Sequence, residues 1–341
     1  MADTNPSRLG LVNATGTGVD ALFLKKFAGE VLSAFEEKNI MKSMHTVRTI
    51  QNGKSAQFPV TGKATAAYHV VGDDIADTAN SYLNNIKHNE RVITIDELLI
   101  SPVFIANLDE AKNHYDVRSI YSTEIGNALA NTFDKNIIRT VVAASRAAAL
   151  IDATSTPAGG SATCATATTE SAVTGDELVD LLFAAAQKLD ENDVPEDNRN
   201  CVLRPAAYYK LLNSTDNKLN QLSRDYNNPN GSIASGTIVE VAGIRIHKTN
   251  HIPSTDESGA DTVGENNDLF SGGTNTGYGG DFAKTLGAVF HPAAAGTVKL
   301  MDLGLESEYQ IQRQGHLFVA KYAMGHGILR GSNAVELLLK S

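Results

Sequence analysis

Residues 107–149, NLDEAKNHYDVRSIYSTEIGNALANTFDKNIIRTVVAASRAAA, carry one helical pattern throughout, and no proline interrupts it. Apolar residues recur at every fourth position, a spacing that indicates a helix rather than a strand, at Val117, Tyr121, Ile125, Leu129, Phe133, Ile137 and Val141. Asn107 and Glu110 are spaced as a capping box at its start. Such a helix extends roughly 60 Å at about 1.5 Å per residue. The pattern favours an elongated, plate-like subunit over a compact enzyme.

The alternative is a pair of shorter helices broken near Gly126 or Asn131. Glycine inside a helix costs only about 1 kcal/mol relative to alanine, so Gly126 does not exclude one long helix. Each four-residue step overshoots a helical turn by roughly 40°, and the apolar stripe therefore winds around the helix axis. We expect different parts of this helix to pack against different neighbours.

Composition limits the class of protein. The chain has 341 residues, of which 42% are hydrophobic and 20% are charged, which is enough for one large domain or two smaller ones. Its formal net charge of −10 argues against a protein that grips DNA or an anionic membrane through a basic face. No run approaches the ~20 apolar residues of a membrane span. Residues 1–18 lack a signal-peptide pattern, so we expect folding in a cytosol.

The first third of the chain reads as an arm followed by extended structure. Residues 21–35 form an amphipathic helical pattern. Two strand patterns, 45–50 and 55–60, flank the tight-turn signal Asn52-Gly53. Residues 92–95 are predicted to form a returning strand. The polar segment 61–89, which separates the strands at 55–60 and 92–95, is too long for a compact hairpin loop. We expect a projecting finger that meets another chain, with a merely flexible loop as the alternative.

The second half predicts a mixed module and then a long hairpin. Thr174 and Glu177 are spaced as a capping box before a helix at 178–189. The remaining elements that we predict are strands at 200–203, 237–241, 244–247, 297–301, 308–312, 316–322 and 334–340, a helix from Pro205 to Asn213, a hairpin turn at Gln314-Gly315 and a mobile glycine-rich loop at 261–281.

The sequence contains no complete motif for catalysis or for ligand binding. Gly53-Lys54-Ser55 ends like a phosphate-binding loop, but Arg48 stands where the first glycine is required and a strand follows instead of a helix. His247 and His251 are four residues apart but follow a strand, which makes a metal pair improbable. Two cysteines without a CxxC pair exclude a disulfide framework. We expect no enzyme, no cofactor and no metal site, and a structural or binding role instead.

Six segments occur in an order that carries a family resemblance: ALFLKKFAGEVLSAF, VRTIQNGKSAQFPVTG, IKHNERVITIDELL, AKNHYDVRSIYSTEIGNALA, GTVKLMDL and VAKYAMGHGILR. This order resembles the major capsid protein of T7-like podoviruses. The resemblance implies the α+β, HK97-like capsid fold. It would assign residues 1–46 to an N-terminal arm, 47–100 to an extended β-hairpin loop, 101–175 with 296–341 to a peripheral domain holding the spine helix, and 176–295 to an axial domain.

The same resemblance implies a self-assembling structural protein of a tailed bacteriophage. It would form hexamers and pentamers of an icosahedral shell in the host bacterial cytoplasm and remain in the virion capsid. Its implied partners are other copies of itself, a scaffolding protein, a portal protein and packaged double-stranded DNA bound without sequence specificity, with no membrane. The alternatives are an encapsulin-like nanocompartment shell, a soluble enzyme with a nonstandard site, and a viral tail or adhesin module.

Exposed charge on segments without a local core indicates where subunits would meet. In the extended loop we predict inter-subunit contacts by Arg48, Lys54, Phe58, Lys87, Glu90 and Arg91. At the local three-fold contact we predict Gln312, Arg313, Gln314 and Gly315.

Overall fold

The computed structural model describes residues 39–76, 82–83, 86–108, 117–154, 156–212, 231–232, 237–238, 240–257 and 278–340. The predicted arm helix at 21–35, Glu110 of the first capping box and most of the glycine-rich loop lie outside these ranges.

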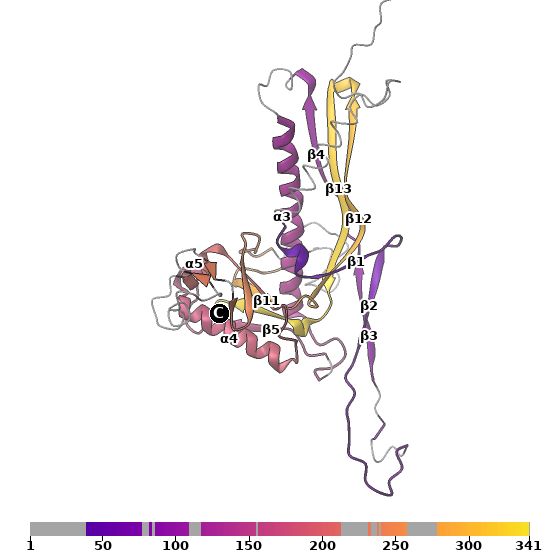
Figure 1. Ribbon diagram of the computed structural model, residues 1–341, viewed down its shortest axis with the longest axis vertical. Helices are drawn as coiled ribbons and strands as arrows, with labels where there is room; N and C mark the ends of the chain where they lie inside the picture. The colour runs from indigo at the N-terminus through magenta and orange to yellow at the C-terminus, as the bar shows by residue number, and fades with distance from the viewer. Residues whose placement is uncertain are drawn as a thin grey trace, which may run out of the picture.

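One long helix, α3 (Val117–Arg146), runs along the long axis of the molecule (Figure 1). It continues through Gly126 and Asn131, so the prediction that the helix is not broken at these residues is confirmed. The predicted start at Asn107 is not tested, because residues 109–116 lie outside the described ranges. It ends at Arg146, three residues before the predicted end, where the Gly159 N–H donates to the Ala147 carbonyl. An added Cβ on Gly159 would lie 2.2 Å from the Ser145 carbonyl oxygen, so the returning chain lies tightly against the last turn.

A four-stranded sheet lies beside α3 in the order β1-β12-β13-β4 (Figure 1). Its strands are β1 (Thr46–Thr49), β12 (Ala295–Gln310), β13 (Gly315–Ile328) and β4 (Leu99–Ala106). The predicted hairpin is confirmed: β12 and β13 pair antiparallel around a short 3-10 turn, η4 (Ile311–Arg313), and Gln314 is left-handed at φ 51°.

The two strands on either side of Asn52-Gly53 do not pair with each other. Gly53 does turn, at φ 117°, but β1 pairs in parallel with β12 instead of with β2 (Ser55–Thr61). The physical reason is that β12 offers a long edge, whereas β2 already pairs antiparallel with β3 (His88–Thr94). We call β2 and β3 the ribbon. It extends away from the body toward the end of the molecule opposite the hairpin tip (Figure 1), as the predicted finger requires.

A six-stranded sheet forms the second part, in the order β5-β14-β11-β6-β10-β9. Its strands are β5 (Gly160–Thr163), β14 (Ala334–Leu338), β11 (Thr285–Phe290), β6 (Asn200–Leu203), β10 (Ile244–Lys248) and β9 (Glu240–Val241). The helices of this part are α4 (Gly175–Glu191) and α5 (Pro205–Leu212). The short elements are η1 (Met41–Ser43), η2 (Glu170–Ala172), η5 (Gly331–Asn333), β7 (Gly231–Ser232) and β8 (Thr237–Ile238).

The second capping box is confirmed on the Thr174 side. The Thr174 hydroxyl accepts from the Glu177 N–H at 3.3 Å, as predicted. The Glu177 carboxylate, however, accepts from the Thr166 N–H at 2.6 Å and from the Ala167 N–H at 3.1 Å. Both of these donors belong to residues outside α4. They tie the start of α4 to the loop after β5.

The core confirms that different parts of α3 have different neighbours. Phe133 packs edge-on against Tyr322 and His326 of β13, with ring centroids 6.4 and 5.2 Å apart. At the end of the helix, Arg146 forms two hydrogen bonds with Glu336 of β14, of 2.6 and 2.7 Å. The helix therefore joins the four-stranded sheet to the six-stranded sheet.

Candidate assembly surfaces

The ribbon lies across β13 at two glycines. A Cβ on Gly325 would lie 1.9 Å from the Thr94 carbonyl oxygen and 2.8 Å from the Ile95 Cα. A Cβ on Gly327 would lie 2.6 Å from Cγ1 of Ile93. Larger residues at these two positions would push the ribbon away from the hairpin. The glycines therefore permit the close approach that sets the ribbon's direction.

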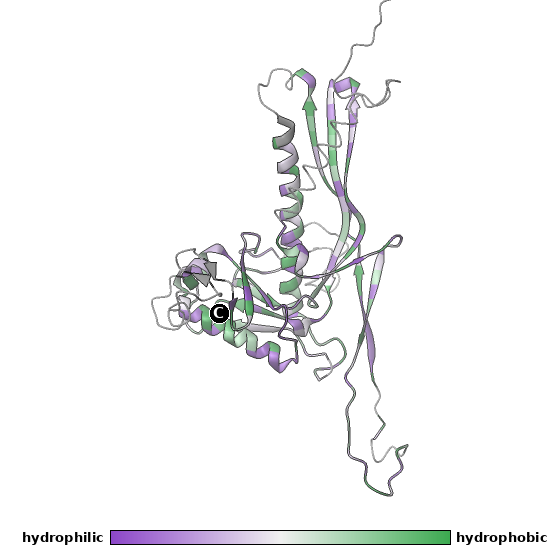
Figure 2. Cartoon of the chain, in the orientation of Figure 1, coloured by the Kyte–Doolittle hydropathy of each residue, from purple (hydrophilic) through white to green (hydrophobic). Residues whose placement is uncertain are grey.

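A small core holds only the base of the ribbon. Its buried members are Ala56, Ile93, Ile95, Val298 and Ala323. Beyond this point the chain exposes large apolar side chains, which Figure 2 shows as hydrophobic segments on the loop past the ribbon. Those in the described part of this loop are Tyr68, Val70, Val71, Ile75, Leu83 and Ile86. Apolar side chains on a projection with no local core are suited to burial against another protein.

On the other face of β13, His326 belongs to a buried hydrogen-bond chain. His45 Nδ1 lies 2.7 Å from the Met41 carbonyl oxygen, which only accepts, so Nδ1 carries the proton. A neutral His45 then accepts at Nε2 from the Thr297 hydroxyl, 2.8 Å away. Thr297 Oγ1 in turn accepts from His326 Nδ1 at 2.8 Å. Burial lowers the pKa of His45 and lowers that of His326 to about 3, which agrees with two neutral rings.

A buried carboxylate holds the backbone of residues 40 and 41 against α3. Asp134 of α3 is fully buried and accepts from the backbone N–H groups of Ile40 and Met41 at 3.0 and 3.1 Å. His251 Nδ1 lies 3.4 Å from the same carboxylate, so this histidine faces Asp134. A single polar residue inside an amphipathic helix gives no signal of its own, so the role of this aspartate was not predictable from the sequence.

The structure brings together Arg48 and Phe58 among the predicted contact residues. The Arg48 guanidinium lies 5.4 Å from the Phe58 ring centroid and donates to the Gln57 carbonyl at 2.9 Å. Lys54 and Glu90 are exposed, and neither has an ion pair within the described ranges. Lys87 is also exposed, with its Nζ 3.7 Å from Asp152 Oδ2.

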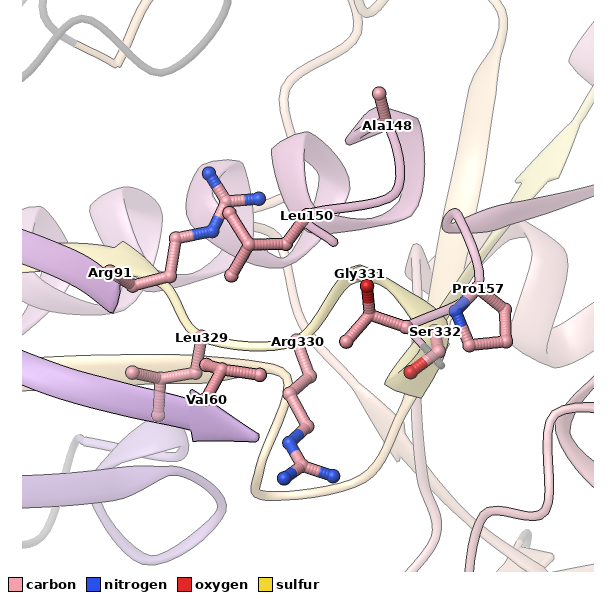
Figure 3. Close-up of a pocket in the computed structure, with 10 residues that line it drawn as sticks. Val60, Arg91, Ala148, Leu150, Pro157, Leu329, Arg330, Gly331 and Ser332 are labelled. Atoms are coloured by element: carbon pink, nitrogen blue, oxygen red, sulfur yellow. The ribbon is translucent and has the colours of Figure 1, made fainter. Parts of the chain in front are cut away.

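Arg91 lines a pocket between the ribbon, the segment after α3 and the segment after β13 (Figure 3). In that view Arg91 and Leu150 lie on one side, and the Arg330 side chain extends from the other. The Arg91 Nε is buried without a hydrogen-bond partner among the described residues, and burial lowers the pKa of this guanidinium.

The hairpin tip places the other four predicted residues together. Gln312, Arg313 and Gln314 are exposed, and the Gln314 amide donates to the Ile311 carbonyl at 2.8 Å. Gly315 is buried instead, because a Cβ there would lie 2.4 Å from the Ile105 carbonyl oxygen. Ile311, which the sequence pattern placed in the strand predicted at 308–312, is instead 72% exposed at the tip.

The described ranges contain no group of three or more His, Cys, Asp or Glu residues arranged to hold a metal ion. Both cysteines, Cys164 and Cys201, are buried and free. No helix in the same ranges is long and apolar enough to cross a membrane.

Comparison with known proteins identifies the family of this chain. Residues 57–338 match the model of the Gp10A-like family, major capsid protein. The chain belongs to this family of capsid proteins. It is 34% identical to the major capsid protein of Escherichia phage T7 over 332 residues, which cover 94% of this chain and 92% of the T7 protein. It resembles the capsid structure of cyanophage P-SCSP1u with a TM-score of 0.75 and 43% identity, over 100% of both chains.

The capsid protein therefore has the HK97-like fold and is a structural component of a tailed phage capsid, whose shell is built from copies of it. The virus-like particle of Pyrococcus furiosus matches with a TM-score of 0.52 over 92% of this chain, at 14% identity, which shows a shared fold alone. Family membership thus favours the phage capsid over the nanocompartment shell that the sequence left open. The long α3 also removes the case for a mostly β tail module.

Proposed function

We propose that the capsid protein forms hexamers and pentamers of an icosahedral shell, assembled with a scaffolding protein and a portal protein in the host bacterial cytoplasm. The observation that carries this proposal is the extended ribbon with its apolar loop, because Tyr68 and Val71 are almost wholly exposed in the single chain. Burying one large apolar side chain stabilises by about 1.5–3 kcal/mol. Several such weak contacts, repeated around a ring, give a closed shell without any single tight interface.

The charge of the chain supports enclosure of DNA instead of specific binding. The net charge of −10 makes the wall repel double-stranded DNA on average, so the packaged genome would not adhere to it through a continuous basic face. We further propose that this protein acts without catalysis.

We propose that the six-stranded sheet with α4 and α5 forms the axial domain, and that α3 with the four-stranded sheet forms the peripheral domain. On this division, the axial sheet also includes β5 and β14, which lie near the C-terminal ends of the two ranges predicted for the peripheral domain, 101–175 and 296–341. The ribbon and its loop then account for the extended loop between β1 and β4.

We also propose that Lys54, Glu90 and Arg91 contact neighbouring subunits, and that the tip residues Gln312 and Arg313 lie at a three-fold contact. Lys54 and Glu90 lack ion pairs within the chain's described part, and Arg91 has a buried nitrogen to satisfy. Arg48 and Phe58 bind each other, so their role in contacts would be to present a stacked surface.

The test replaces residues 63–86 with an Asn-Gly turn. The Gly62 N–H donates to the Lys87 carbonyl at 2.9 Å, so the shortened ribbon can still close. We expect a folded subunit with unchanged circular dichroism that forms no shells when it is co-expressed with its scaffolding protein. A variant with serine at Tyr68, Val70 and Val71 keeps the loop length and should assemble poorly. Normal shells from both variants would refute the proposed role of the loop.

A further inference from the structure

Asp96 lies at the point where the ribbon rejoins the body, between the end of β3 at Thr94 and the start of β4 at Leu99. Its backbone N–H donates to the Met324 carbonyl at 3.3 Å. Its side chain turns inward, where Oδ2 accepts a hydrogen bond from the Tyr278 hydroxyl. The other oxygen, Oδ1, is buried and has no hydrogen-bond partner among the described residues.

Tyr278 carries this contact to the crossing strand. The tyrosine is fully buried, and its hydroxyl also accepts from the His326 N–H at 3.0 Å. His326 stands between Gly325 and Gly327, the two residues against which the ribbon lies. The hydrogen bonds therefore join the base of the ribbon, Tyr278 and the strand that the ribbon crosses.

Among the residues that the structure describes, no cation lies near enough to Asp96 to stabilise a negative charge. The titratable groups around this cluster are Tyr278, Tyr322 of β13, His326 of β13, His45 after η1 and Asp134 of α3. Both histidines are held neutral, as shown above, and Asp134 adds a second acidic group. Burial raises the pKa of Asp96 to about 7, and the hydrogen bond from Tyr278 opposes this shift.

We propose that Asp96 is a positioning residue that holds the ribbon closed on the body while its carboxyl is neutral and lets the joint open when the carboxyl ionises. A neutral carboxyl tolerates burial with one hydrogen bond, whereas a carboxylate with an unpartnered oxygen requires water. Water reaches Oδ1 only if the segment 95–98 moves away from Tyr278. Any consequence for assembly rests on the proposed function, because the ribbon's direction matters only where subunits meet.

Linkage fixes the sign and size of the effect. When the joint is open, the Asp96 carboxyl is exposed and has its ordinary pKa of 3.8. When the joint is closed, the pKa of this carboxyl is about 7. Between pH 3.8 and 7, opening of the joint therefore releases a proton. The equilibrium constant for opening rises about tenfold for each pH unit in this range and levels off near pH 7. Above that level both forms are ionised, and the equilibrium no longer depends on this group.

The test is hydrogen exchange on the full chain, measured from pH 5 to 8 as protection factors for peptides covering residues 91–98. For the wild type we expect protection to fall about tenfold per unit between pH 5 and 6.5 and to level off near pH 7. Asp96→Asn keeps an acceptor for Tyr278 without an ionisable group and should give a flat profile. Tyr278→Phe removes the donor that favours the anion, so the plateau should move to higher pH.

Glu97→Gln is the matched control, because Glu97 is exposed and adjacent, and this variant should keep the wild-type profile. A flat wild-type profile, or an Asp96→Asn variant that follows the wild type, would overturn the role of Asp96. Shell formation by the wild type, followed by electron microscopy in the same samples, reports separately on the proposed function. Intact shells with a flat profile would therefore reject the joint and leave the capsid role standing.

Discussion

Gly325→Ala places a methyl group directly between the ribbon and β13. The added carbon would lie 1.9 Å from the Thr94 carbonyl oxygen, whereas ordinary contacts begin at about 3.4 Å. The shortfall is 3.4 − 1.9 = 1.5 Å, and the opposing atom belongs to the backbone of β3. No rotamer change can relieve this overlap, so one of the two strands must move.

Overpacking of this kind costs typically about 1–3 kcal/mol when the structure adjusts. We expect a value at the upper end, because Ile95 Cα opposes the same methyl at 2.8 Å. Gly304→Ala is the matched control, since it also adds a methyl to a strand of this hairpin, but its nearest neighbour is 3.9 Å away. Glycine inside a strand is less favourable than alanine by roughly 0.5–1 kcal/mol, so the control should be neutral or slightly stabilising.

The assay combines urea unfolding of the purified subunit with electron microscopy of material co-expressed with the scaffolding protein. Gly325→Ala should unfold at lower urea and form few closed shells, because the ribbon leaves the body in a changed direction. Gly304→Ala should match the wild type in both measurements. If Gly325→Ala unfolds with the control and builds normal shells, the crossing does not set the ribbon's direction.

Four further predictions concern the core, the arm, the tip and pH. Arg146→Met leaves Glu336, which is 1% exposed, without its cation and should lower the free energy of unfolding in urea by about 3–5 kcal/mol. Adding Glu336→Leu to this variant should restore much of the lost free energy of unfolding. Asp134→Ala removes the acceptor for two backbone N–H groups and should cost about 1–3 kcal/mol, with faster proteolysis near residue 40. Ile311→Asp should change subunit stability by about 0.5 kcal/mol or less but prevent shell closure in electron micrographs. Burial lowers the pKa of His326 from 6.5 to about 3, so the unfolded chain binds a proton at a higher pH than the folded chain does. The stability that a neutral His326 contributes is therefore present above pH 6.5 and is lost as the pH falls toward 3. A His326→Gln variant with the same acid dependence in urea unfolding would contradict this.

Sequence patterns predicted the elements that are held by contacts between residues close together in the sequence. The four-residue spacing around Leu129 and Phe133 identified α3, because a helix satisfies its own hydrogen bonds and its apolar stripe is a local pattern. The turn at Gln314 was predictable for a similar reason: it joins two alternating segments that are adjacent in sequence and pair directly.

Long-range choices were not predictable. β1 pairs with residues 296–299, some 250 positions away, and nothing within residues 45–60 distinguishes that partner from β2. The chain of His45, Thr297 and His326 joins residues far apart in sequence, and each is unremarkable alone. Most contact candidates in the extended loop are charged, and Ile311 was predicted to lie inside a strand, so this exposed apolar residue was missed.

The segment 325–327 shows why a short motif carried so much of the family resemblance. Alternate residues of a strand face opposite sides, so Gly325 and Gly327 meet the ribbon while the His326 side chain points into the core. The glycines determine how closely the ribbon approaches, and the histidine's backbone N–H binds the tyrosine that contacts the ribbon's base. The direction of an exposed, assembling segment is thus determined at a buried strand. Substitutions in that strand should affect shell geometry as strongly as substitutions in the exposed loop itself.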